Sequence, residues 1–333
     1  MKQETIKIRK WQLLRWKGRE LADLQNAELV AVGKRAFARQ ARLEEVLMPP
    51  TLSAVKTAAF RGCAHLHRVT LARENAVGLA AEAFRDCAYL REIEGSEMLS
   101  VIGNYAFTGC RNLRELRLGR DLRRIGQLAF ADCVSLEALT IPSCVEQLGD
   151  GCFSGCTELR EITLEEGLTG LGAGMFRGAI ALRQAPVFPE SVREIPKDCF
   201  RDCSAIEVLE LPGSLRRVGS GAFRGCSRLR QVSLSLGTAE VCTRAFAGWR
   251  DLESVALPHS IKKIGFGAFG LGWSRNKIRI LADNEYMQKR LRTLLWRCGS
   301  IGRVTVVFEG KTLAERKRER HKRSLHDEPT HIS

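Results

Sequence analysis

A phenylalanine recurs every 23 or 24 residues along most of this 333-residue chain. Of its 14 phenylalanines, 11 share this single register. A constant period of this length is typical of stacked supersecondary units, each of which packs against its two neighbours. The residues in register are Phe37, Phe60, Phe84, Phe107, Phe130, Phe153, Phe176, Phe200, Phe223, Phe246 and Phe269.

Other residue types keep the same register and define a common repeat. An aliphatic residue stands five positions before each phenylalanine, and seven of these residues are followed by glycine, as in Ile102-Gly103. Apolar residues also stand six, nine and eleven positions after it, as in Leu136, Leu139 and Ile141. The alternating Leu-x-Leu end predicts a short strand with one buried face. The Gly-x-x-Ala-Phe segment predicts a turn, or a single helical turn, that places the phenylalanine in the core.

One repeat is too small to bury its own apolar side chains, so about ten repeats must stack side by side. We therefore predict an α/β repeat solenoid with a curved parallel β-sheet on one side and short turns or helical turns on the other. The repeats occupy residues 29–273. We expect an N-terminal cap over 1–28, a C-terminal cap made of a helix and a strand over 274–310, and a basic tail over 311–333.

The predicted C-terminal cap has two elements. Asp283 is placed to cap a helix whose apolar side includes Leu291 and Leu295. Val304–Phe308 has the composition of a strand. A solenoid needs such elements because its last repeat would otherwise leave core residues open to water.

The signature Ala-Phe-x-x-Cys-x-x-Leu stands intact at residues 59–66, 106–113 and 222–229. This pattern resembles the BspA-type branch of leucine-rich repeat proteins over about residues 29–273. The resemblance implies a leucine-rich repeat solenoid that serves as a ligand-binding scaffold, often adhesive and at the cell surface. The chain departs from the pattern where Ala179 and Trp249 replace the cysteine and where Gly95 replaces a strand leucine.

The chain has 12 cysteines, and seven of them stand three positions after the repeat phenylalanine. Two more, Cys152 and Cys199, replace the alanine that precedes it, which indicates a small buried residue. Column neighbours would lie close enough for disulfides, but identical neighbours give no preferred pairing, and Cys-x-x-Cys is absent. We interpret these residues as packing thiols, and we expect no metal and no cofactor.

Signatures of catalysis do not form a consistent set. Residues 265–270 match the dinucleotide pattern Gly-x-Gly-x-x-Gly, yet they lie within the repeat and no βαβ unit follows. The six histidines form no His-Glu-x-x-His motif. No nucleophile, orienting group and oxyanion site occur together. We therefore expect no enzyme activity and no small-molecule substrate.

In a stack of this kind, the exposed strand positions are available to a partner. They lie seven, eight and ten residues after each phenylalanine and carry charges of both signs. One reading is a solvated face with cross-strand Arg–Glu pairs, and the other is a face that binds an as yet unidentified protein. The candidate residues are Glu92, Glu94, Arg114, Glu115, Arg117, Arg160, Glu161, Glu207, Glu210 and Arg230.

The net charge of +15 is concentrated at the two ends. Residues 1–35 carry +5, residues 36–273 carry +2, and residues 274–333 carry +8. An alternative hypothesis is therefore an electrostatic binder of nucleic acid or anionic membrane, with the repeats as a spacer. Its candidate residues in the tail are Arg316, Lys317, Arg318, Arg320, Lys322 and Arg323.

No stretch of about 18 apolar residues occurs, which argues against a membrane-spanning helix. The first residues lack the apolar segment of a signal peptide. We expect a cytoplasmic, non-enzymatic scaffold that binds a protein through its strand face. A cell-surface adhesin exported without a visible signal is a further alternative.

Overall fold

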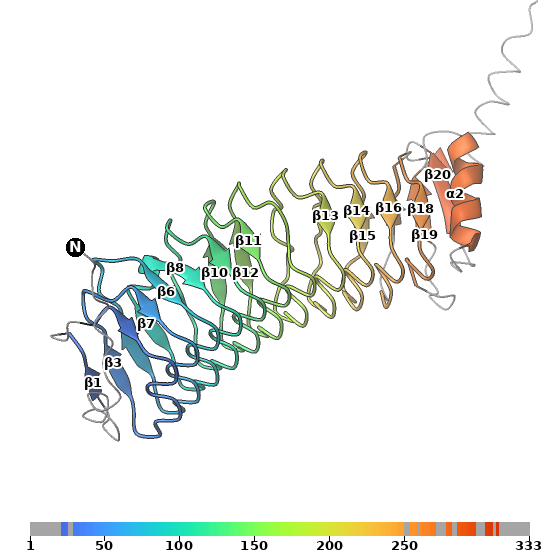
Figure 1. The fold of residues 1–333 in the computed structure, drawn as a ribbon. Helices are drawn as coiled ribbons and strands as arrows, with labels where there is room; N and C mark the ends of the chain where they lie inside the picture. The colour runs from blue at the N-terminus through green and yellow to red at the C-terminus, as the bar shows by residue number, and fades with distance from the viewer. Residues whose placement is uncertain are drawn as a thin grey trace, which may run out of the picture.

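The computed structural model shows one elongated solenoid (Figure 1), in which each repeat forms one coil around a common core. Successive coils lie side by side, so residues about 23 positions apart in the sequence are neighbours in space. The N-terminal coils are at one end, and helix α2 (Glu285–Arg297) is at the other. The structure describes residues 21–25, 29–249, 254–258, 260–270, 278–281, 285–297, 304–308 and 311–312.

The predicted Leu-x-Leu strands form one side of the solenoid, which we call the strand face. Each is parallel to its neighbours, and the buried central residues are in register, as in Val46, Val69 and Ile93. These strands are β1 (Leu21–Asp23), β3 (Glu45–Leu47), β5 (Arg68–Thr70), β7 (Glu92–Glu94), β10 (Ala138–Ile141), β12 (Glu161–Leu164), β15 (Gln231–Ser233), β17 (Ser254–Ala256), β19 (Ile278–Leu281) and β20 (Val304–Phe308).

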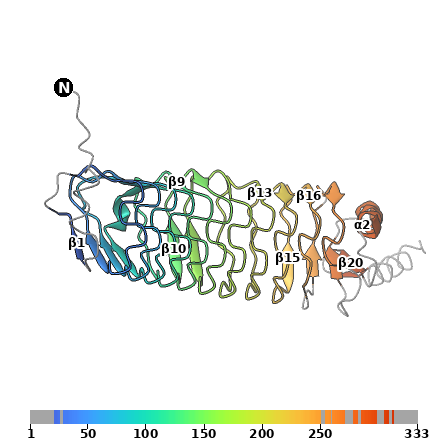
Figure 2. The ribbon, with the colours of Figure 1, turned by 60° about the horizontal axis from the view of Figure 1, so that its bottom comes forward.

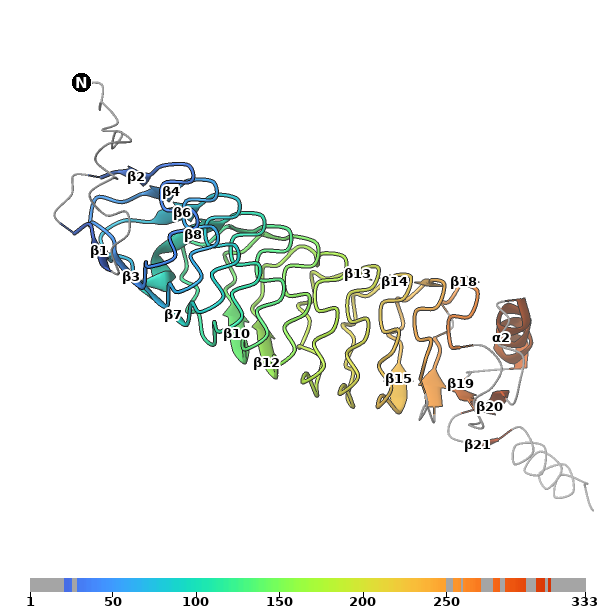
Figure 3. The ribbon, with the colours of Figure 1, turned by 90° about the horizontal axis from the view of Figure 1, so that it is seen from below.

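A second series of parallel strands, which the sequence did not predict, contains the aliphatic residue that precedes the repeat glycine. Figures 2 and 3 place this series on a different side of the solenoid from the strand face. Most members are only two residues long, too short for an alternating pattern to reveal them. They are β2 (Ala31–Val32), β4 (Ala54–Val55), β6 (Val77–Leu79), β8 (Leu99–Ile102), β9 (Arg124–Ile125), β11 (Gln147–Leu148), β13 (Glu194–Ile195), β14 (Arg217–Val218), β16 (Glu240–Val241) and β18 (Lys263–Ile264).

The segment around each phenylalanine forms the third side, which we call the turn side. Its described segments are the predicted short turns and none is helical, so the helical turns and the α/β class are not confirmed for the coils. In each turn, the residue two positions before the phenylalanine has a positive φ, as at Gly151. The backbone N–H of the phenylalanine donates to the neighbouring coil, as from Phe130 to the carbonyl of Cys152 at 2.8 Å. Bonds that run between coils take the place of the bonds within a helix.

The repeat phenylalanines form a continuous stack through the core. Neighbouring rings are parallel to within 26°, and their centroids lie 5.1–5.7 Å apart. The stacked geometry at these distances is favourable for aromatic rings. Ten of the eleven rings are essentially inaccessible to solvent, and Phe269 is 6% exposed. The central prediction, that the recurring phenylalanines hold the coils together, is confirmed.

The strand face is interrupted, contrary to the single continuous sheet that we predicted. The first break follows β7, where Gly95 has a φ of 75° and leads into the short 3-10 helix η1 (Ser96–Met98). In the next coil, the backbone N–H of Arg117 donates to the Ser96 hydroxyl at 3.1 Å rather than to a strand carbonyl. A second break falls where the isolated bridge between Gln184 and Val208 is the only pairing among the described residues.

The C-terminal cap agrees with its predicted helix and strand. Helix α2 contacts β18, and its Leu291 and Leu295 are buried against the last coils. Strand β20 has the predicted bounds, and it pairs antiparallel with β21 (Lys311–Thr312), unlike the parallel pairs before it. Asp283, the expected helix cap, lies outside the described residues, as does most of the predicted N-terminal cap.

Candidate interaction surface

All ten residues proposed for partner binding lie on the strand face and are exposed. Glu92 and Glu94 are on β7, and Glu161 begins β12. Arg160 and Arg230 immediately precede strands β12 and β15. The remaining five lie at the interruptions of the sheet, in the segments 114–117 and 207–210. Because the side chains alternate along each strand, their buried neighbours such as Ile93 hold them outward.

Ion pairs between adjacent coils occupy the N-terminal part of this face. Arg68 lies 3.4 Å from Glu92 and 3.7 Å from Glu94, which also accepts a hydrogen bond from Thr70. His67 lies 3.3 Å from Glu45. These side chains are about 40–50% exposed, and such pairs contribute little to stability. This part of the face thus contains the cross-strand pairs that the solvated reading expects.

The centre of the face is different. Arg114, Glu115 and Arg117 are exposed on one coil and have no ion-pair partner within the described part of the chain. Arg160 in the coil after next pairs with Glu158 of its own coil, at 3.2 Å, rather than across coils. The interruption at this coil therefore leaves a row of charges free to contact another molecule.

Aromatic side chains also flank the face, although the sequence analysis assigned none there. His65 and Tyr89 stack with their centroids 5.8 Å apart and their planes within 11°. Tyr89 is 51% exposed, and it lies three residues before β7. His65 and Tyr89 each stand five residues after a repeat phenylalanine, and this shared spacing could have predicted the pair. Exposed tyrosine is a residue type that often anchors interfaces.

The second strand series carries its own charged row, which the sequence analysis missed. Arg217 on β14 pairs with Glu194 on β13 and, at 3.2 Å, with Glu240 on β16. Glu240 also accepts a hydrogen bond from Lys263 on β18 at 2.9 Å. The bond from Lys263 lowers the pKa of Glu240, and the bond to Glu240 raises the pKa of Lys263. These charges satisfy one another, so this row is a structural feature.

The cysteine column is a set of buried hydrogen-bond donors. Each thiol donates to the carbonyl of the phenylalanine in the preceding coil, as from Cys133 to Phe107 at 3.2 Å. At Trp249, which replaces the cysteine, the indole N–H donates to the Phe223 carbonyl at 3.0 Å. The same acceptor is therefore satisfied by two chemically different donors. The prediction of packing thiols is confirmed, and the structure adds the bond that they make.

Burial keeps most of these thiols protonated; the exception is Cys63, whose pKa is lowered, chiefly by a side-chain hydrogen bond with Cys87. Burial raises the pKa of Cys156 and of Cys203 to about 12, and it raises the pKa of Cys133 well above its usual range. A thiol acts as a nucleophile or a metal ligand only as the thiolate. Among the described residues, no group of three His, Cys, Asp or Glu side chains is arranged to hold a metal ion.

Two further predictions concern the basic tail and membrane-spanning helices. The basic tail residues, Arg316 to Arg323, are outside the described residues, so the hypothesis of an electrostatic binder stays a prediction. Within the described part of the chain, no helix has the length and apolar character needed to span a bilayer.

Comparison with known families matches the chain to the model of the BspA type leucine rich repeat region, in six copies over residues 30–79, 77–207 and 193–291. The chain belongs to the BspA-type leucine-rich repeat family. The resemblance carried by the Ala-Phe-x-x-Cys-x-x-Leu signature is thus confirmed. No curated protein matches the chain by sequence.

Solved structures similar to this BspA-type chain share its repeat type at low identity. A leucine-rich repeat protein from Bacteroides ovatus is 19% identical, with a TM-score of 0.44, over 86% of this chain and 91% of that one. The pneumococcal vaccine antigen PcpA is 17% identical, with a TM-score of 0.44, over 84% of this chain and 87% of that one. At these values the similarities carry no argument of their own, and the family rests on the sequence match.

Proposed function

We propose that this BspA-type protein is a non-enzymatic scaffold that binds a protein partner through the centre of its strand face. The observation that carries the proposal is the row formed by Arg114, Glu115 and Arg117, which is exposed and unpaired among the described residues. Both signs of charge stand in this row. A nucleic acid would favour a face of positive charge alone, whereas a protein surface can match alternating charges.

The rigidity of the scaffold supports the same function. The coils are joined by hydrogen bonds on all three sides and by the phenylalanine stack, so the charged side chains project from a backbone with little freedom. Binding to such a rigid surface costs less conformational entropy than binding to a surface whose loops must first become ordered. The exposed Tyr89 beside β7 supplies an apolar anchor near the charged row.

The test compares two triple variants that remove the same charge from different faces. The first carries Arg114→Ala, Arg117→Ala and Arg160→Ala on the strand face. The matched control carries Arg123→Ala, Arg124→Ala and Arg193→Ala, which are exposed at or beside the second strand series. Each protein is first checked for an unchanged melting temperature.

Capture of partners from the native cell is then measured by quantitative mass spectrometry at low and high salt. We expect the strand-face variant to lose at least tenfold of the capture of a specific protein, while the control retains it. Equal capture by both variants would place the binding surface elsewhere. Loss in both would mean that the interaction depends on net charge and not on the strand face.

A further inference from the structure

The turn side of the first coil departs from the rest of the solenoid. In every described coil, the residue two positions after the phenylalanine has a positive φ. Glycine and aspartate are well suited to this left-handed conformation, whereas a long side chain at such a position is uncommon. The first coil has Arg39, with a φ of 58°. The later coils in which the structure describes this position have Gly or Asp there, namely Gly62, Asp86, Gly109, Asp132, Gly155, Gly178, Asp202, Gly225 and Gly248.

A second arginine on the same coil has a similar backbone. Arg35, two positions before Phe37, has a φ of 55°, and this position has a positive φ in the other coils too, whatever its residue, as at Leu128 and Arg244. Neither Arg35 nor Arg39 has an ion-pair partner in the described part of the chain. Backbone strain of this kind is often retained where it serves a function. At Arg39, where the later described coils have Gly or Asp, it holds an exposed guanidinium group, and neither Arg39 nor Arg35 has an acid within ion-pair distance among the described residues.

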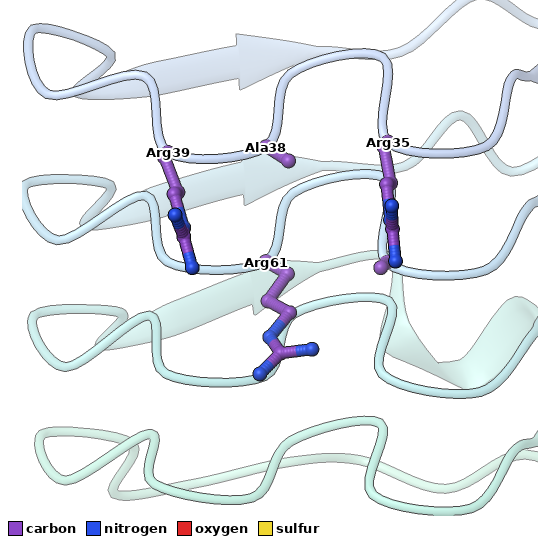
Figure 4. Close-up of a pocket in the computed structure, with 5 residues that line it drawn as sticks. Arg35, Ala38, Arg39 and Arg61 are labelled. Atoms are coloured by element: carbon purple, nitrogen blue, oxygen red, sulfur yellow. The ribbon is translucent and has the colours of Figure 1, made fainter.

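The two arginines line a shallow depression together with a third. Figure 4 shows Arg35 and Arg39 at the two ends of the first turn, both extending toward the next coil, and Arg61 starting on that coil at a position between them and extending on toward the third coil. Ala38 and Ala58 supply the rest of the lining, so no large side chain fills the space, which has a volume of about 290 Å³. We call Arg35, Arg39 and Arg61 the arginine cradle.

Acidic side chains of the third coil form ion pairs with Arg61 but not with Arg35 or Arg39. Its guanidinium lies 2.7 Å from Glu82 and 4.0 Å from Asp86, both on the third coil. Three later coils have an aspartate at the position that Arg39 has in the first coil, namely Asp86, Asp132 and Asp202. The first coil therefore reverses the charge that this column has elsewhere.

We propose that the arginine cradle binds a phosphate monoester group. A phosphate monoester has close to two negative charges at neutral pH and three terminal oxygens, and these match the two unpaired arginines. Guanidinium groups form paired, parallel hydrogen bonds to phosphate oxygens. A single carboxylate has one charge, which would leave one of the two arginines unpaired. This site lies on the turn side and is independent of the function proposed for the strand face.

The test uses substitutions to glycine, which several other coils have at each of these positions. Arg39→Gly and the double variant Arg35→Gly/Arg39→Gly remove the unpaired charges while relieving the left-handed backbone, so the melting temperature should not fall. The matched control is Arg177→Ala, which removes an exposed arginine on the seventh coil, at the position equivalent to Arg61.

Binding is measured by calorimetry at low salt with inorganic phosphate and with acetate. Flotation with vesicles that contain phosphatidic acid provides a separate arm, which distinguishes a lipid headgroup from a free phosphate. We expect phosphate to bind more tightly than acetate, Arg39→Gly to weaken phosphate binding about tenfold, and the double variant to abolish it. Arg177→Ala should bind as the native protein does.

Binding to the vesicles alone, lost in the double variant, would support the site with a lipid as the source of the phosphate. Three results would overturn the proposal. They are the absence of binding in both arms, equal binding by the native protein and the double variant, and an equal loss in Arg177→Ala.

Discussion

The column of buried thiols makes a sharp prediction about stability. Cys133 is inaccessible to solvent, and its thiol donates to the Phe107 carbonyl at 3.2 Å. Cys133→Ala removes this bond, whose net contribution is about 0.5–1 kcal/mol because a thiol is a weak donor. It also removes buried apolar volume close to that of one methylene, which contributes about 0.8 kcal/mol. We expect a loss of about 1.5 kcal/mol in the free energy of unfolding.

A second substitution separates the hydrogen bond from packing. Cys133→Ser keeps a donor that can reach the Phe107 carbonyl, so this variant should be more stable than Cys133→Ala. If the cysteine only filled space, the serine would bury a hydroxyl without a partner. Such a group costs about 1–3 kcal/mol, and the serine variant would then be the less stable of the two. The sign of the difference between the two variants therefore decides between the explanations.

Urea unfolding under reducing conditions, followed by far-UV circular dichroism, is the assay. Because neighbouring coils are coupled in a line, parts of the solenoid can unfold separately. The comparison is therefore restricted to conditions in which circular dichroism and tryptophan fluorescence give the same transition. A serine variant that is less stable than the alanine variant would refute the role that we assign to the thiol.

Two further predictions concern pH and close packing. Burial raises the pKa of Cys156 to about 12 in the folded protein, above the value of about 8.5 for a free thiol. The contribution of this buried thiol to the free energy of unfolding is therefore fully present below pH 8.5 and is lost as the pH rises toward 12. Between pH 8 and pH 10, the native protein should therefore lose roughly 2 kcal/mol more stability than Cys156→Ala in urea titrations, and parallel curves would contradict this. A Cβ added at Gly103 would lie 2.6 Å from the backbone of Ala80, whereas at Gly33, in the same repeat position, it would meet nothing within 4 Å among the residues that the structure describes. Gly103→Ala should thus lower the melting temperature by several degrees while Gly33→Ala leaves it nearly unchanged, and equal shifts in thermal denaturation would show that the close approach is not the cause.

The sequence analysis succeeded where a property repeats along the chain. The eleven phenylalanines in register predicted the stack, and the alternation of Leu-x-Leu predicted the strand face. Helix α2 and strand β20 were predicted because each is long enough to show a period of its own. Burial of the cysteine column was predicted from its spacing and from Cys152 and Cys199, which stand where other repeats have alanine.

Other features were missed because their causes lie between coils. The two-residue strands such as β9 have no periodicity, and they exist only because the neighbouring coil supplies hydrogen-bond partners. The turn side was expected to include helical turns because the sequence did not reveal that its N–H groups would donate to the next coil. The free charges of Arg114 and Arg117 depend on a break that starts at Gly95, one coil earlier.

The sequence by itself determined the architecture of this protein. A constant period of apolar residues leaves a chain no way to bury them except by stacking its repeats. Only the tertiary structure decided the chemistry of the surfaces: which carbonyl each thiol contacts, which charges pair, and which arginines lie together in the cradle. Most of these contacts join residues of adjacent coils, more than 20 positions apart in the sequence, and their geometry is set by the spacing of those coils.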